Sequence, residues 1–129
     1  APGGAGLFTA PAVWTQGGRT WLFAADFSST AAYSLSGGSG QPHLVKAWEA
    51  SKAGTSPIVA GGLLYVYDPN GGTLEVYRPT TGQLLHSLAV GSGHWSSPII
   101  LGGRIVLPAG NANDHASTGV VVIYHQPGR

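Results

Sequence analysis

The sequence contains no cysteine and no methionine, and only 9% of its 129 residues are charged. Without cysteine the chain has no disulfide, no thiolate metal ligand and no cysteine nucleophile. Its six Lys and Arg residues are scattered, so the basic stripe that binds phosphates is missing and nucleic acid is not an expected partner. No apolar run approaches the roughly 20 residues that span a bilayer as a helix, so no membrane span is expected.

The residues that are abundant predict an ordered β protein. Hydrophobic residues make up 43% of the chain, which excludes a disordered chain, and there are 21 glycines and 9 prolines to interrupt helices. Short runs rich in Val, Ile, Leu, Tyr and Trp recur between turn residues, as strands do. Sparse charge with abundant Gly, Ser and Thr is typical of exported bacterial proteins, so we expect an extracellular, cell-surface or periplasmic location.

The same pattern of residues recurs along the chain. Residues 55–62 (TSPIVAGG) match residues 96–103 (SSPIILGG), and residues 9–14 with Gly17 and Gly18 form a weaker copy. The spacing is roughly 40 to 45 residues, which is the length of a propeller blade of four short strands. The glycine pairs fit tight hairpin turns, because glycine adopts positive φ without steric cost.

Each glycine pair is followed by an expected strand, a polar loop and another strand, and the first two units have room for an outer strand. The expected strands after the glycine pairs are residues 20–25, 31–35, 44–49, 63–67, 73–78, 83–90, 104–108 and 119–125, and the apolar residues before each glycine pair form the first strand of each unit. The predicted fold is therefore all-β: a partial β-propeller of about three four-stranded antiparallel blades, the last lacking its outer strand. Its approximate blades are residues 7–50, 51–91 and 92–129.

Three blades are fewer than the roughly four that close a ring. We therefore expect the chain to be the C-terminal part of a larger propeller or one subunit of a ring. Its expected partners are the remaining blades or copies of itself, because terminal blades would expose apolar faces.

Several segments carry a family resemblance, among them the Ser-Pro-apolar-Gly-Gly stretches that begin at Ser56 and Ser97. In residues 76–86 (VYRPTTGQLLH), Thr81-Gly82 falls on the Thr-Gly of the pyrroloquinoline-quinone-like, or quinoprotein alcohol dehydrogenase-like, propeller repeat. Arg78 stands where that family usually has Asp, and His86 where it usually has Trp, although Trp48 is present in the first unit. The chain thus resembles this family over nearly its whole length. The resemblance implies the fold, but this repeat serves quinone-dependent dehydrogenases, an outer-membrane protein assembly lipoprotein and many surface proteins.

The resemblance raises pyrroloquinoline quinone (PQQ) with Ca²⁺ as a cofactor. Calcium takes six to eight oxygen ligands, usually with several carboxylates. The chain has five Asp and Glu residues in all, spread along the sequence, and only residues 111–114 (NAND) cluster candidate oxygens. No cofactor is therefore predicted, and a fragment of a PQQ-dependent dehydrogenase stays as the alternative.

The candidate site residues lie in two loops that would open on the same face of a propeller. A ligand-binding site is predicted from His94, Trp95, Asn111, Asn113, Asp114 and His115. A metal site of His94, Asp114 and His115 is a weaker interpretation. The alternatives are a polar turn at 111–114 and a Trp95 packed between blades. Residues 26–29 and 68–72 are interpreted as turns, and Glu75, Arg78 and His86 as surface residues.

No residue set predicts catalysis. The chain has neither a Gly-x-Ser-x-Gly elbow nor a phosphate-binding loop followed by lysine. We therefore expect a non-catalytic binding or scaffold module that holds a protein, peptide or glycan on its loop-bearing face. A structural display domain without a ligand is the other alternative.

Overall fold

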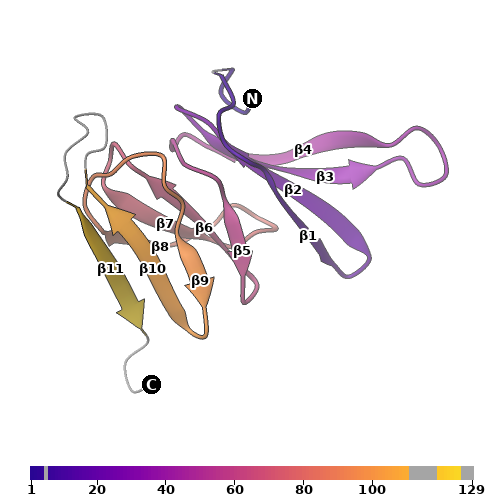
Figure 1. Ribbon diagram of the computed structural model, residues 1–129. Coiled ribbons are helices and arrows are strands. Elements are labelled where there is room, and N and C mark those ends of the chain that lie inside the picture. The colour runs from indigo at the N-terminus through magenta and orange to yellow at the C-terminus, as the bar shows by residue number, and fades with distance from the viewer. Residues whose placement is uncertain (5, 111–118, 126–129) are drawn as a thin grey trace.

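The structure is a computed structural model, and it describes residues 1–4, 6–110 and 119–125. Within these residues, strands form three antiparallel sheets that stand side by side (Figure 1). No helix long and apolar enough to cross a membrane occurs in this part of the chain.

Each sheet follows the order of the sequence. The first contains β1 (Ala12–Gln16), β2 (Arg19–Ala25), β3 (Thr30–Ser36) and β4 (His43–Ala50), and the second contains β5 (Ile58–Ala60), β6 (Leu63–Asp68), β7 (Thr73–Tyr77) and β8 (Leu84–Ala89). The third contains β9 (Ile99–Leu101), β10 (Arg104–Ala109) and β11 (Val120–His125). The all-β prediction with sheets of 4, 4 and 3 strands is confirmed.

The internal repeat is visible in the backbone as well as in the sequence. The glycine pairs at 17–18, 61–62 and 102–103 have nearly identical φ angles, close to +57° and +74°. Positive φ at both central residues is the geometry of a type I′ hairpin, which matches the twist of the strands. A bulge also recurs on the fourth strand, where Ala47 of the first sheet and Leu85 of the second are the extra residues opposite Ala32/Tyr33 and Val76/Tyr77.

The largest hydrophobic core lies between the first and second sheets. Trp21, Phe23 and Ala25 of β2 pack against Leu64 and Val66 of β6. These residues alternate along their strands, so each strand presents one apolar face to the other sheet. Trp21 is buried in this core, with 7% of its surface exposed.

Trp48 extends this core to the outer strands. Its ring lies 5.8 Å from that of Tyr77, and its indole N–H donates a 2.7 Å hydrogen bond to the carbonyl of Pro79. The ring also lies against Gly82, where a Cβ would come within 2.6 Å of it. Burial, together with the charges of Glu75 and Asp68, raises the pKa of Tyr77 to about 12, so its hydroxyl stays neutral.

A smaller core joins the second and third sheets. Tyr67, Leu74 and Val90 pack with Leu107 of β10. The first strands of the three sheets also lie next to one another, with β1 beside β5 and β5 beside β9. The second sheet is therefore covered on both faces, and the first and third each have one face against it.

Glu75 is buried, with only 1% of its surface exposed, so its interpretation as a surface residue is wrong. Its Oε1 accepts hydrogen bonds from Thr73 and Ser87 and lies 3.4 Å from the ammonium of Lys52. Its Oε2 is buried without a hydrogen-bond partner. The sequence pattern missed this because two of the partners, Lys52 and Ser87, come from other segments of the chain. Arg78 and His86 are exposed, as predicted.

Gly82→Ala tests the contact with Trp48. Gly61→Ala is the matched control, because Gly61 also has positive φ but a Cβ there meets nothing within 4 Å. We expect Gly82→Ala to lower the free energy of unfolding by about 1–3 kcal/mol more than Gly61→Ala, through overpacking against the indole. Urea denaturation of both variants measures the difference, and equal losses would contradict the contact.

Candidate functional site

The turns between the second and third strands of the first two sheets lie at one end of the molecule, here called the loop end (Figure 1). Asp26 organises the first of these turns: its Oδ1 accepts hydrogen bonds from the backbone N–H groups of Ser28 and Ser29, both at 2.9 Å. Asp68 organises the second in the same way, by accepting from Asn70 and Gly71 at 3.1 and 2.9 Å. The interpretation of residues 26–29 and 68–72 as turns is confirmed.

Asp26 also holds the N-terminal segment against this turn. Its Oδ2 accepts a 2.8 Å hydrogen bond from the backbone N–H of Gly3. Desolvation alone would raise the pKa of this buried carboxyl, but the backbone hydrogen bonds from Ser28, Ser29 and Gly3, with that from the Ser28 hydroxyl, outweigh it and lower the pKa. The carboxylate is therefore ionised and occupied with structural hydrogen bonds.

The turn at Asp26 presents Phe27 at the centre of an exposed aromatic cluster, which we define as Phe8, Phe27, His94 and Trp95. The Phe27 ring lies 5.5 Å from Phe8 and 4.5 Å from Trp95, in both cases edge to face. His94 lies 6.3 Å from Trp95 between ring centres. Such edge-to-face pairs are favourable because the positive edge of one ring meets the negative face of the other.

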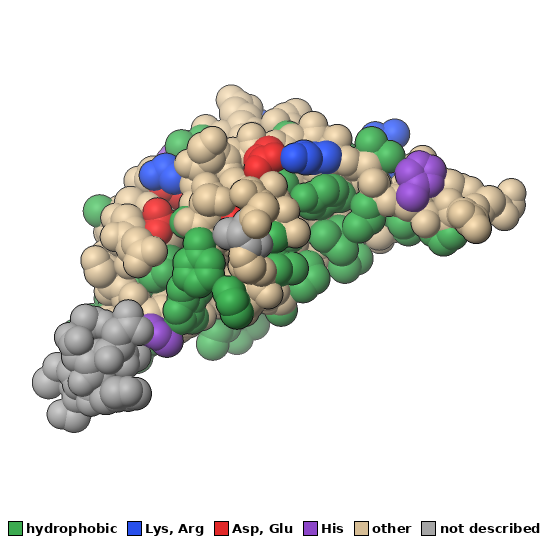
Figure 2. All heavy atoms as spheres, turned by 90° about the horizontal axis from the view of Figure 1, so that it is seen from above, with side chains coloured by type: hydrophobic (Ala, Val, Ile, Leu, Met, Phe, Trp, Pro, Cys, Tyr) green, Lys and Arg blue, Asp and Glu red, His purple; other side chains and the backbone are tan. Residues whose placement is uncertain are grey.

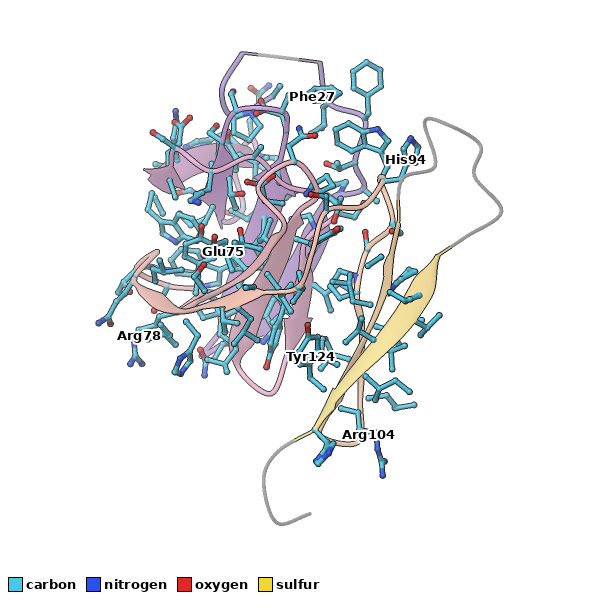
Figure 3. All side chains as sticks on the ribbon, turned by 90° about the vertical axis from the view of Figure 1, so that its left-hand side faces the viewer. Phe27, Glu75, Arg78, His94, Arg104 and Tyr124 are labelled. Atoms are coloured by element: carbon cyan, nitrogen blue, oxygen red, sulfur yellow. The ribbon has the colours of Figure 1, made fainter. Side chains whose placement is uncertain are left out.

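This cluster is open to solvent. Phe8 is 77% exposed, Phe27 44% and Trp95 36%. Figure 2 looks down on the loop end, and hydrophobic side chains gather there on the surface between tan backbone and polar atoms. Figure 3 shows Phe27 and His94 together at this end, away from Arg104.

The segment that carries His94 and Trp95 is fixed by the second sheet. The Tyr67 hydroxyl donates a 2.9 Å hydrogen bond to the carbonyl of Gly91, and the N–H of Gly93 donates to the carbonyl of Pro69 at 3.1 Å. A side chain at Gly93 would collide with that Tyr67 hydroxyl. Close backbone approach therefore determines where the two aromatic residues emerge.

Of the six predicted site residues, the structure places two. His94 and Trp95 lie in contact at the loop end. Asn111, Asn113, Asp114 and His115 lie outside the described residues, so their place relative to His94 stays a prediction. Sequence reasoning missed Phe8 and Phe27, although a phenylalanine at the tip of an Asp-capped turn is a signal for an exposed aromatic side chain.

The arrangement suits binding by ring surfaces. Among the described residues, no group of three or more His, Asp or Glu side chains is placed to hold a metal ion. Asp26 makes hydrogen bonds to backbone within its own turn, and the cluster itself offers aromatic faces with an imidazole beside them. These groups provide apolar contact area with little conformational freedom to lose on binding.

No protein-family model and no curated protein matches the sequence.

Asp26→Asn tests the role of the carboxylate in the turn. At neutral pH we expect this variant to be about 1–3 kcal/mol less stable, because an amide accepts the backbone hydrogen bonds more weakly than a carboxylate. The folded pKa of Asp26 is below 3.8, so the advantage of the wild type is present above that value and is lost as the pH falls through the folded pKa. Urea unfolding over a pH series measures it, and a stability gap that is independent of pH would contradict the assignment.

Proposed function

We propose that the chain is a non-catalytic binding module, built from blades of a β-propeller, that holds a protein, peptide or glycan partner at its loop end. The observation that carries this proposal is the exposed aromatic cluster of Phe8, Phe27, His94 and Trp95. Aromatic residues are enriched at the centres of interfaces, because each ring buries a large area on contact. An exported or cell-surface location fits such a role.

Several features support the propeller. The three sheets share one strand order, begin with the same glycine hairpin and place their first strands side by side. Blades of residues 7–50, 51–91 and 92–129 accommodate them. The Thr81-Gly82 motif that resembles the PQQ-like repeat family lies in contact with Trp48, which links the motif to the packing of neighbouring sheets.

The test starts from defined ligand libraries. The purified protein is applied to a glycan array and to a display library of random peptides, and each hit is remeasured by calorimetry. For a ligand held at the aromatic cluster, Trp95→Ala and Phe27→Ala should each weaken binding by at least about tenfold, as truncation of an interface hot spot does.

Val45→Ala is the matched control, because Val45 is 46% exposed and lies on β4, outside the cluster. Its affinity should equal that of the wild type. Equal affinities for all variants would contradict the assignment of the site. A stoichiometric absorbance change on addition of PQQ and Ca²⁺, with dye-reducing activity, would contradict a non-catalytic role.

The third sheet leaves one face open, and this face is apolar. Ile99 and Ile123 both pair with Val106, and Leu101 pairs with Arg104, so their side chains share the face opposite to Ile105. Ile99 is 61% exposed, Leu101 75% and Ile123 56%. A contiguous apolar surface of this kind is typical of an interaction site.

We therefore expect the isolated chain to have a native mass above its own 13.1 kDa, because further sheets or further copies cover this face. Native mass spectrometry, compared with the denatured mass, distinguishes copies of one chain from a second polypeptide. Ile123→Lys should shift the population toward the monomer, since a charge on the buried face costs free energy. A wild-type monomer at micromolar concentration would contradict the prediction.

A further inference from the structure

The repeat allows the outer strands of the first two sheets to be compared position by position. Trp48 pairs with Ala32 immediately before the bulge of the first sheet, and His86 pairs with Val76 immediately before the bulge of the second. His86 therefore occupies in the second sheet the position that Trp48 occupies in the first. Both side chains belong to the fourth strand of their sheet.

The surface that faces them is also repeated. Tyr77 pairs with Leu64 in the second sheet, and Tyr124 pairs with Ile105 in the third. Leu64 and Ile105 each follow the glycine pair at the same distance. Tyr124 therefore occupies in the third sheet the position that Tyr77 occupies in the second, on the side that faces the preceding sheet.

The two interfaces differ in how this position is filled. Between the first and second sheets, the indole of Trp48 lies against Tyr77 and the backbone at Gly82. Between the second and third sheets, the smaller His86 is exposed, and a cleft of about 480 Å³ is present instead. The cleft is lined on the second sheet by Leu63, Tyr65, Val76 and Leu88, and on the third by Ile105 and Tyr124.

This cleft is separate from the aromatic cluster. Figure 3 shows Tyr124 toward the end of the sheets at which Arg104 lies, away from Phe27 and His94. Residues at the two glycine hairpins contribute to its lining, including Leu63 and Gly103. A ligand in the cleft would contact both sheets and would leave the loop end free.

We propose that the cleft between the second and third sheets binds a small, neutral aromatic compound of the size of indole. The first interface shows what fits this position, because there the chain supplies an indole of its own. The walls are mostly aliphatic and aromatic, with Arg104 and His125 also among the lining residues, and no Asp or Glu lines them to hold a cation. Hydroxyls of Tyr65 and Tyr124 and the imidazole of His86 provide polar partners for a ring N–H or hydroxyl. Ligand sites of this kind are typically apolar, with a few polar groups that fix orientation.

Indole itself is the probe. Titration into the wild-type protein, followed by calorimetry and by NMR, should show saturable binding with shifts centred on Tyr65, Leu88, Ile105 and Tyr124. His86→Trp places a tethered indole at the cleft. It should weaken indole binding by at least about tenfold and raise the midpoint of thermal unfolding, because the new ring covers apolar surface.

His43→Trp is the matched control, since it adds the same side chain at an exposed position of β4 in the first sheet. It should bind indole like the wild type. Absence of saturable binding to the wild type, or unchanged binding to a folded His86→Trp, would overturn the proposal. The NMR shifts of the wild-type protein locate the indole without any variant. Shifts centred on Phe27 and Trp95 would place indole at the loop end and would contradict binding in the cleft. The indole titration is independent of the test of the loop end: its results stand even if Trp95→Ala and Phe27→Ala bind their partner like the wild type.

Discussion

Packing of one sheet face on another is the constraint on which this structure depends. Each sheet has apolar residues on both faces, so none can satisfy both faces by itself. The second sheet buries apolar residues on both faces, with Leu64 and Val66 against the first sheet and Tyr67 and Leu74 against the third. The same arrangement leaves the apolar face of Ile99, Leu101 and Ile123 exposed at the end of the row.

The two ends of the strands are built by different chemistry. At one end, the paired glycines make hairpins that need no side chain. At the other, Asp26 and Asp68 cap turns with their carboxylates, and Tyr67 fixes the junction that follows. The capped end can therefore present aromatic side chains from a rigid backbone, because the turns do not depend on those side chains for their shape.

The strands and their grouping could be predicted from the sequence, because glycine pairs and apolar runs are local signals. The burial of Glu75 could not, because its contacts with Lys52 and Ser87 depend on how separate segments meet. For the site, the sequence singled out His94 and Trp95 but not Phe8 or Phe27. Those two rings join the cluster through tertiary contacts between the N-terminal segment, the first sheet and the junction after the second. The sequence showed only that His86 stands where the family repeat usually has Trp. The cleft beside it could not be predicted, because half of its lining comes from the neighbouring sheet.

The buried carboxylate of Glu75 also bears on the fidelity of assembly. Similar sheets in one chain are liable to stack in the wrong order, a characteristic failure of repeat proteins. The positions equivalent to Glu75, on the third strand of the first and third sheets, are Ala31 and Val122. At this position only the second sheet carries a charged side chain. Its partner is Lys52, which follows the last strand of the first sheet and whose carbonyl accepts a hydrogen bond from the Thr30 hydroxyl. A stacking that separated Glu75 from Lys52 would leave the buried carboxylate without its ammonium partner, at a cost of several kcal/mol. This ion pair therefore favours the packing of the second sheet against the first.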